Sequence, residues 1–415
     1  MTRNLAALTF LALLCCAAGP AQDDHHKHRV LIVSASGEES RTNERAEDGS
    51  DEKPFHTIQA AVDVASPGDT IRIRKGVYRN PGFGAGENNG PVALIGKGGN
   101  ADEGSLTLMG DPGAVIEFDG NGGILGGQGV AYVRVQNFVV KGPAAGISES
   151  LAMSHRLDNP GLSKYNGQGI SFPGPSNHIE ILNNVVSDAC GSGIRVNQGD
   201  YILIQGNSVS NSTGCSALAE SALVIAQATN VDDSDKVKIT IKGNRVFGNR
   251  NYLPFYAPNG FPPGAKPPFP SYGKADSTYI IDGSGVYLTR NKQFYAHGKY
   301  LVANNLAYGN GINGLVVHYT DRVIVSNNTI ANNGTVPLDE GRQKNSGLVI
   351  NHSDDIEMLN NRVQVDVPGD WAIRFFGQVT VVKSSGNEVA GGKSDLTTGV
   401  ETVSNIGSIT ELPKD

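Results

Sequence analysis

The sequence is poor in aromatic residues, in cysteine and in positive charge. Aromatic residues make up 7% of the 415 residues and one is tryptophan, which fits a slim core. The formal net charge of −7 argues against nucleic acid or an anionic membrane as a general partner, because proteins that bind either of them usually carry an excess of basic residues. An acidic polymer would therefore need a local basic cleft.

The N-terminal stretch, residues 1–21, has the features of a cleavable secretory signal. Arg3 precedes an apolar run from Leu5 to Ala18, and small residues continue to Ala21. The run is shorter than the roughly 20 apolar residues of a membrane span. We therefore expect a secreted protein, extracellular or in the cell envelope, with no membrane partner.

Asparagine recurs in the sequence within a repeated local pattern. Asn184 and Asn207 are 23 residues apart, as are Asn305 and Asn328. This interval suits one turn of a solenoid made of short strands and is too short for a repeat of paired helices. Larger intervals indicate insertions. The set assigned to the repeat is Asn137, Asn184, Asn207, Asn244, Asn305, Asn328, Asn361 and Asn387.

The pattern around each asparagine is the same from unit to unit. An alternating strand comes first, followed by the asparagine, a short apolar run, a Gly-rich turn and a third strand, as in residues 178–186 and 322–330. Alternation turns one strand face inward. We therefore expect an all-β, three-stranded coil over residues 54–395. An N-terminal strand and charged flexible loop (22–53) precede it, and a C-terminal tail (396–415) follows.

The asparagine has a physical role in a stacked coil. Its amide would bond the amide and the backbone of the coils above and below, as asparagine ladders do in other stacked strands. It would also satisfy backbone groups that a bend leaves unpaired. We predict that Asn184, Asn207, Asn305 and Asn328 form one column.

Two cysteines remain after the N-terminal stretch. Cys190 and Cys215 occupy corresponding turns of consecutive units. Stacking would bring their Cα atoms within about 7 Å, a distance compatible with a disulfide. The alternative is a pair of free buried thiols.

The chain opens with a strand and a helix of recognisable pattern. Arg29-Val-Leu-Ile-Val-Ser precedes the segment from Pro54 to Tyr78, in which Ile58, Ala61, Val62 and Ala65 give a helix an apolar face that Pro67-Gly68 ends. This opening resembles that of secreted right-handed parallel β-helix proteins, including polysaccharide lyases of the pectate-lyase type. The resemblance implies a right-handed single-stranded parallel β-helix with an N-terminal capping helix, which would protect the open strand edges.

The resemblance leaves the activity open. The same opening precedes lyases, epimerases, hydrolases and non-catalytic relatives. Three hypotheses follow: a lyase that cleaves an acidic, uronic-acid polysaccharide by β-elimination, a glycoside hydrolase, and a non-catalytic carbohydrate-binding or envelope solenoid. In each we expect a monomer whose partner is a polysaccharide.

The strands after the Gly-rich turns carry a strip of polar residues. Alternation places Arg195, Tyr287 and His318 on the outward face, together with Asn197, Thr289 and Asn351. β-Elimination needs a cation for the substrate carboxylate, a base and an acid. The predicted catalytic residues are Arg195, Asp282, Arg290 and His318, and the predicted substrate-binding residues are Tyr287, Tyr319, His352 and Tyr165.

Carboxylates precede two of these strands. Glu220 and Asp282 lie on consecutive coils, and Asp232, Asp233 and Asp235 lie in a neighbouring insertion. Glu220 and the three aspartates are candidate ligands of a calcium ion (Ca²⁺), although they also suit solvated turns. Alternatively, Glu220 and Asp282 would serve a retaining hydrolase if their carboxylates were about 5–5.5 Å apart.

Two long insertions are predicted to wall the groove. They cover residues 143–168 and 250–281, and insertions in a solenoid often mark the binding face. The second is rich in proline, which does not pair into a sheet, so it should protrude as a loop. The groove would run between the two insertions.

Overall fold

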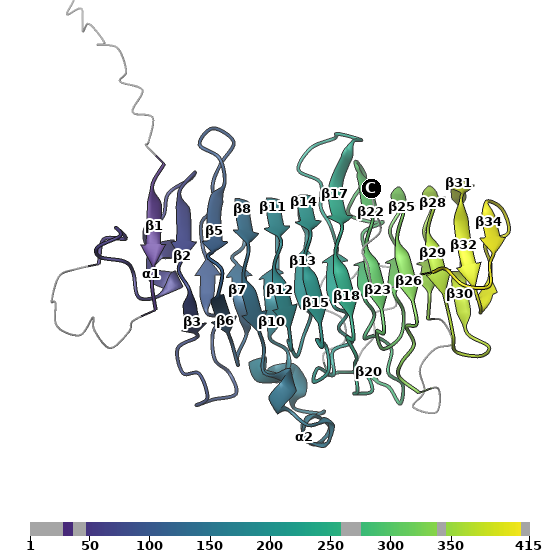
Figure 1. The fold of residues 1–415 in the computed structure, drawn as a ribbon, viewed down its shortest axis with the longest axis horizontal. Coiled ribbons are helices and arrows are strands. Elements are labelled where there is room, and N and C mark those ends of the chain that lie inside the picture. The colour runs from purple at the N-terminus through teal and green to yellow at the C-terminus, as the bar shows by residue number, and fades with distance from the viewer. Residues whose placement is uncertain (1–27, 36–46, 259–274, 338–345, 408–415) are drawn as a thin grey trace, which may run out of the picture.

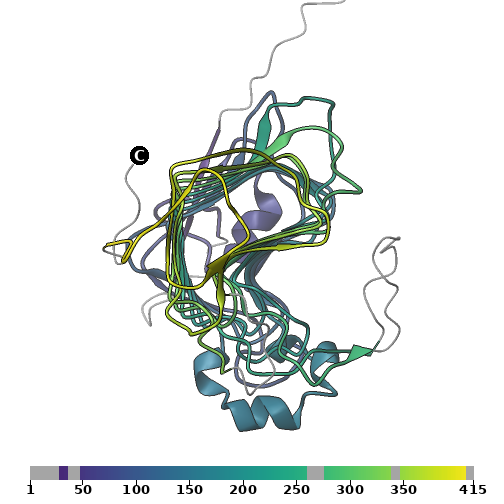
Figure 2. The same cartoon turned by 90° about the vertical axis from the view of Figure 1, so that its right-hand side faces the viewer.

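The computed structural model describes residues 28–35, 47–258, 275–337 and 346–407. The predicted signal and parts of the 22–53, 250–281 and 396–415 segments lie outside these ranges. The described strands stack along one axis and form three long sheets of parallel strands (Figure 1). This arrangement confirms the predicted right-handed parallel β-helix. Viewed along that axis, the coils superimpose as one closed outline (Figure 2).

Each complete coil contributes one strand to each of three sheets, here called sheets A, B and C in chain order. Sheet A contains β1 (Val30–Val33), β2 (Thr70–Ile73), β5 (Leu106–Gly110), β8 (Val130–Gln136), β11 (Ser176–Leu182), β14 (Gly199–Gln205), β17 (Val237–Lys242), β22 (Lys299–Ala303), β25 (Val323–Ser326), β28 (Ile356–Leu359) and β31 (Val381–Ser385). Sheet B contains β3 (Gly76–Arg79), β6 (Ala114–Glu117), β9 (Val139–Lys141), β12 (Val185–Ser187), β15 (Ser208–Ser210), β18 (Arg245–Phe247), β23 (Leu306–Tyr308), β26 (Thr329–Ala331), β29 (Arg362–Gln364), β32 (Asn387–Ala390) and β34 (Val400–Thr402). Sheet C contains β4 (Ala93–Ile95), β7 (Gly122–Gly126), β10 (Gln168–Phe172), β13 (Ile194–Asn197), β16 (Leu223–Ala226), β21 (Val286–Thr289), β24 (Leu315–His318), β27 (Leu348–Asn351), β30 (Trp371–Phe376) and β33 (Lys393–Ser394).

The core is a set of aliphatic columns inside the coil. Ile179 and Ile181 of β11 pair in register with Ile202 and Ile204 of β14, and all four are at most 1% exposed. Burying such a side chain stabilises the fold by about 1.5–3 kcal/mol. Between these positions, Glu180 faces outward. The period-two pattern of the sequence therefore sets which face of each strand is inside.

The predicted asparagine ladder runs through the turn between sheets A and B. The backbone N–H and the side-chain amide of Asn184 donate to Asn207 Oδ1 at 2.9 and 3.0 Å, and the amide also donates to Val135 O at 3.1 Å. Asn207 repeats these contacts with Asn244. The confirmed column is Asn184, Asn207, Asn244, Asn305, Asn328, Asn361 and Asn387.

Asn137 does not belong to this column, so the predicted set is wrong by one residue there. Asn137 adopts a left-handed conformation with φ of 65°, as does Asn183 with φ of 55° directly before the ladder. Phe138 takes the ladder position, and its N–H donates to Asn184 Oδ1 at 3.0 Å. Asparagine tolerates the left-handed region better than most residues, so one residue type serves two adjacent positions.

The structure contains a second asparagine ladder that the sequence analysis did not predict. In the turn between sheets B and C, Asn249 donates to Asn310 Oδ1 at 2.9 Å, and Asn310 donates to Asn333 Oδ1 at 2.8 Å. Ser212 N–H begins the column with a bond to Asn249 Oδ1 at 3.0 Å. The signal was present, because Asn310 and Asn333 repeat the same 23-residue interval.

The disulfide and the first helix follow the predictions. Cys190 and Cys215 are bonded, with Cα atoms 4.8 Å apart. Helix α1 (Ile58–Val64) begins at Thr57, whose hydroxyl accepts the Ala60 N–H at 3.1 Å. Ile58, Ala61 and Val62 are buried. The helix lies at the N-terminal end of the stack and within the outline of the coils (Figures 1 and 2).

The remaining elements belong to the insertions. Helix α2 (Glu149–Ser154) and three short 3₁₀ turns, η2 (Ala144–Gly146), η3 (Asn159–Gly161) and η4 (Ser163–Tyr165), lie in the first, and the antiparallel pair β19 (Tyr256–Ala257) and β20 (Ala275–Asp276) lies in the second. Figure 1 shows α2 and β20 on one long edge of the solenoid and the loop before β17 on the opposite edge. No helix in the described ranges is long and apolar enough to cross a membrane.

Candidate functional site

The outward face of sheet C carries the predicted strip. The strand register aligns Arg195 with Val224, Tyr287, Val316 and Val349 in one column. A second column contains Asn197, Ala226, Thr289, His318 and Asn351. Predicted side chains from separate coils therefore share one surface, as strand alternation requires.

Arg195 and Glu220 form a shielded ion pair on this face. Arg195 Nη1 lies 2.7 Å from Glu220 Oε2, and the two side chains are 16% and 8% exposed. Ser192 donates a second hydrogen bond to the same oxygen at 2.6 Å. Glu220 precedes β16, so the turn from sheet B delivers its carboxylate to a guanidinium on the neighbouring strand β13.

Asp282 lies beside this pair and is also shielded, with 8% of the residue exposed. Its Oδ1 accepts a hydrogen bond from Ser221 Oγ at 2.8 Å. Burial raises the pKa of the Asp282 carboxyl to about 7, against the lowering effect of Ser221, and the charge of Glu220 raises it further. The Asp282 carboxyl therefore gains and loses its proton near neutral pH.

His318 has the opposite shift. Its Nδ1 contacts Thr289 Oγ1 at 2.8 Å across adjacent strands. Burial lowers the pKa of the imidazole to about 4, and the charges of Arg290 and His352 lower it further. The ring is therefore neutral at pH 7 and able to accept a proton.

Tyr287 interacts with both His318 and Asp282. Its ring centroid lies 6.0 Å from that of His318. Burial raises the pKa of the Tyr287 phenol above its usual range, and the charge of Asp282 raises it further. The phenol therefore stays protonated at neutral pH and can donate a hydrogen bond to a ligand.

A column of left-handed residues borders the strip where the sheet C strands end. Gln198, Gln227, Arg290, Tyr319 and His352 have φ values of 49°, 54°, 57°, 45° and 48°. Burial lowers the pKa of Arg290, and the neighbouring Arg195 charge lowers it further. The Tyr319 and His352 rings stack with centroids 4.6 Å apart. The sequence placed these residues at strand ends but did not reveal their shared backbone conformation.

The two long insertions form one wall, which corrects the prediction of two facing walls. Arg156 of the first donates to the carbonyls of Pro254 at 2.8 Å and Phe255 at 3.0 Å, and it pairs with Asp276 at 2.8 Å, all in the second. The described parts of both therefore stand on the same edge of sheet C. The opposite edge is bordered by the left-handed column.

Tyr165 lies inside that wall. The residue is 1% exposed and packs with Cys190, Cys215, Leu253 and Tyr256 in a small separate core. The structure therefore places Tyr165 where it holds the two insertions together. The predicted sugar contact does not match this position.

The predicted calcium ligands are not gathered into one cluster. Asp232 accepts hydrogen bonds from Tyr201 at 2.6 Å and Lys238 at 3.0 Å, while Asp233 and Asp235 lie 3.6 and 3.3 Å from ring nitrogens of His297. Glu220 instead pairs with Arg195, as described above. No three His, Cys, Asp or Glu side chains in the described ranges are placed to hold one metal ion. Calcium binding stays an untested prediction.

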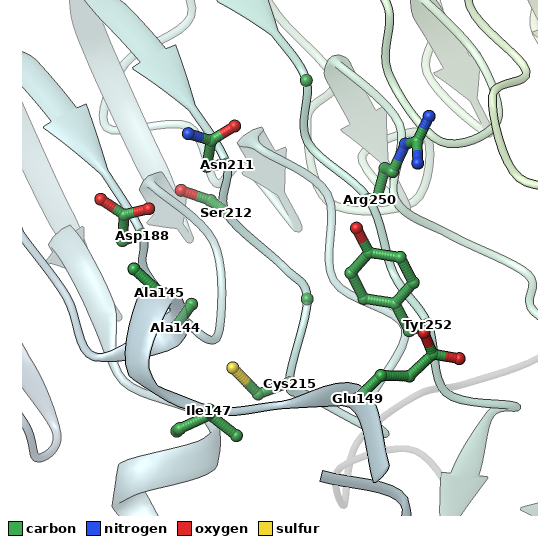
Figure 3. Close-up of a pocket in the computed structure, with 12 residues that line it drawn as sticks. Ala144, Ala145, Ile147, Glu149, Asp188, Asn211, Ser212, Cys215, Arg250 and Tyr252 are labelled. Carbon is green, nitrogen blue, oxygen red and sulfur yellow. The ribbon is translucent and has the colours of Figure 1, made fainter. Parts of the chain in front are cut away.

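A separate cavity of about 290 Å³ lies between the first insertion and the turns that follow strands of sheet B. Glu149, Asp188, Asn211, Arg250 and Tyr252 contribute to its lining (Figure 3). In Figure 3, Asp188 and Asn211 lie on the side away from Arg250 and Tyr252. None of the residues predicted for catalysis or substrate binding lines it. The acid and base groups of sheet C are therefore distinct from this cavity.

Comparison with known proteins supports the architecture. Residues 130–393 match the family described as right-handed beta helix region. No curated protein sequence matches the chain.

Solved structures with a similar course include the mannuronan C-5 epimerase AlgE4 A-module of Azotobacter vinelandii, with 14% identity, coverage of 83% of this chain and 86% of that one, and a TM-score of 0.47. A rhamnogalacturonan lyase shows 15% identity, coverage of 86% and 87%, and a TM-score of 0.41. The pectate lyase Pel9A shows 13% identity, coverage of 91% and 79%, and a TM-score of 0.37. At these values the likeness carries no conclusion about activity.

Proposed function

The chain belongs to the right-handed beta-helix family, and from that premise we propose that it is a lyase that cleaves an acidic polysaccharide by β-elimination. One observation carries the proposal. On the outward face of sheet C, burial raises the pKa of the Asp282 carboxyl to about 7 and lowers that of the His318 imidazole to about 4. Titratable groups whose environments separate their pKa values are typical of acid–base catalysis.

The residues have complementary roles in this proposal. The guanidinium groups of Arg195 and Arg290 neutralise the uronate carboxylate, which makes the proton on the adjacent carbon more acidic. The His318 ring nitrogen that does not contact Thr289 takes that proton. As the carbon–carbon double bond forms, the glycosidic carbon–oxygen bond breaks and Asp282 protonates the departing oxygen. Proton exchange with water then restores His318 and Asp282.

A glycoside hydrolase is the second candidate, and the carboxylate pair favours it. Glu220 pairs with Arg195 and accepts a hydrogen bond from Ser192, whereas burial raises the pKa of the Asp282 carboxyl to about 7. A nucleophilic carboxylate beside a protonated one is the arrangement of retaining hydrolysis. The two candidates differ in their products, because only elimination leaves an unsaturated sugar.

The disulfide supports an extracytoplasmic location for the proposed activity. Disulfides persist in oxidising compartments and are rare in the cytosol. Cys190 and Cys215 form such a bond between consecutive coils. Fractionation of the source cells would test this location, and recovery of the protein only from the cytosol would contradict it.

Incubating the purified protein with a panel of uronic-acid polymers, with and without calcium, tests the function. We expect ultraviolet absorbance from the unsaturated product, and the calcium arm tests the predicted ion independently. New reducing ends without that absorbance would replace the lyase with the hydrolase. Binding without any cleavage would leave the carbohydrate-binding solenoid.

A further inference from the structure

The outward face of sheet C has a second cluster at its C-terminal end. Strand β30 presents Trp371, Arg374 and Phe376, and each is half-buried. The Arg374 guanidinium carbon lies 4.6 Å from the ring centroids of both Trp371 and Phe376. Lys393 of the next strand places its ammonium 5.6 Å from the Trp371 ring. We call these four residues the aromatic platform.

The two cations of the platform differ from three outward arginines of the other sheets. In sheet B, Arg79 pairs with Glu117 and Arg362 with Glu388 on the adjacent strand, and in sheet A Arg134 pairs with Glu180. Among the described residues, neither Arg374 nor Lys393 has a carboxylate within 4.0 Å. The platform therefore presents positive charge that its own strands do not neutralise.

The acid that follows the platform in sequence has a different partner. Asp395 Oδ2 accepts the Phe375 backbone N–H at 2.7 Å. The Arg374 guanidinium lies close to both aromatic rings. A guanidinium carries its N–H donors as a planar fork, and this fork matches a carboxylate.

The platform is aligned with the acid–base residues. Arg374 continues the column of Tyr287, Val316 and Val349, whereas Phe376 continues the column of His318 and Asn351. Because parallel strands are spaced about 4.8 Å apart, Arg374 lies roughly 14 Å from Tyr287 along the solenoid axis. A polymer lying along sheet C would therefore reach both places at once.

We propose that the aromatic platform is a subsite for one uronic sugar of the substrate polymer. A glycosidic bond elsewhere in the same polymer molecule is cleaved beside Asp282 and His318. Arg374 and Lys393 bind the carboxylate of the sugar at the platform, and the aromatic rings hold the two cations in place. This inference rests on the proposed function, because it takes the polymer to be acidic. It adds a site several coils away from the reacting bond.

The single tryptophan of the chain allows a direct test. The intact protein would be titrated with galacturonate and mannuronate oligomers while Trp371 fluorescence is recorded, with neutral galactose oligomers as the uncharged control. Calorimetry with the same oligomers measures binding independently of any change in fluorescence. We expect binding of the charged oligomers only, and weaker binding as salt screens the cations.

Arg374→Gln is the informative variant, and Arg362→Gln is its matched control because Arg362 lies on sheet B and pairs with Glu388. We expect Arg374→Gln to weaken binding about tenfold or more, since charge-assisted hydrogen bonds are roughly twice as strong as neutral ones. On a cleaved polymer, the same variant should raise KM and leave kcat nearly unchanged, as loss of uniform binding does. Thermal unfolding of both variants would verify that each is folded.

The outcomes separate this inference from the proposed function. Unsaturated product together with unchanged binding and KM in Arg374→Gln would overturn the platform and keep the lyase. Binding that depends on Arg374 without any unsaturated product would keep the platform and overturn the lyase. Equal binding of neutral and charged oligomers would overturn the assignment of a carboxylate site.

Discussion

Neighbouring coils carry the same residue in the turn between sheets A and B and different residues on the outward face of sheet C. In the turn, asparagine follows asparagine from Asn184 to Asn387, and each is at most 1% exposed. On sheet C, one column changes from arginine to valine to tyrosine. A residue that repeats can bond its own copies above and below, so identity between coils stabilises the stack.

The two regions also differ in charge. The ladder consists of neutral amides whose donors and acceptors are paired coil to coil. The sheet C face combines an ion pair with an acid and an imidazole of shifted pKa. Uncompensated burial of charge costs stability, so we infer that sheet C is adapted to chemistry and the ladder to folding.

The largest expected effect is on turnover. His318→Ala should reduce turnover about 10²–10⁴-fold, the usual contribution of a general base, and leave the melting temperature nearly unchanged. His178→Ala is the control, because His178 is another half-buried histidine but lies on β11 of sheet A. Equal activity of the His318 variant and the control would move the base elsewhere.

The next effect is on the pH dependence of stability. The Asp282 carboxyl has a folded pKa of about 7, well above its unfolded value near 3.9, so the folded state binds more protons between these values. Stability conferred by this group is complete at low pH and is lost as pH rises through about 7. At about 1.4 kcal/mol per pKa unit, the loss amounts to at most about 4 kcal/mol.

Asp282→Asn should remove this dependence, and urea unfolding at several pH values would measure it. Asp102→Asn, which removes an exposed carboxylate, serves as the control and should keep the slope of the unmodified protein. If the stability of the Asp282→Asn variant declined with pH as steeply as that of the unmodified protein, burial would not raise the pKa of the Asp282 carboxyl.

A smaller effect is expected in the ladder. Asn207→Ala would remove the Oδ1 that accepts the backbone N–H and the side-chain amide of buried Asn184, and an unsatisfied buried group costs about 1–3 kcal/mol. Gln205→Ala, at an exposed position of the same coil, should change the unfolding free energy little. Chemical denaturation compares the two variants, and indistinguishable midpoints would contradict the importance of the column.

The smallest effect concerns the ion pairs on the outer faces of sheets A and B. Arg362 and Glu388 are each 40% exposed and 3.1 Å apart. A double-mutant cycle of Arg362→Ala and Glu388→Ala should give a coupling of about 0.2–1 kcal/mol that decreases with added salt. A coupling of several kcal/mol would mean that surface charge also helps to stack the coils.

The repeating parts of the fold were predictable because their signal is local and periodic. The 23-residue interval between Asn184 and Asn207 identified the coil, and alternation identified the outward position of His318. The same logic failed at Asn137, where the left-handed residue before the ladder is also asparagine. It was not extended to Asn310 and Asn333, although their interval contains the same information.

The arrangement of the insertions was not predictable because it depends on contacts without a period. Arg156 reaches carbonyls about a hundred positions further along the chain, at Pro254 and Phe255. No spacing in the sequence predicts that contact. Because of this contact, the two insertions form one wall and not the two walls that were expected. Tyr165 is buried for the same reason, since its neighbours come from three separate segments.

The sequence by itself determined the coil and the ladder, because both follow from residues that recur at a fixed interval and must stack. It also predicted that Cys190 and Cys215 lie close together, but it did not decide between a disulfide and two free thiols. It also determined which side chains of sheet C face outward, since a strand alternates. Only the tertiary structure decided that the pKa of Asp282 is raised while that of His318 is lowered, and that Glu220 pairs with Arg195. Those properties arise from burial and from charges on other coils, and neither is encoded in the local pattern of residues.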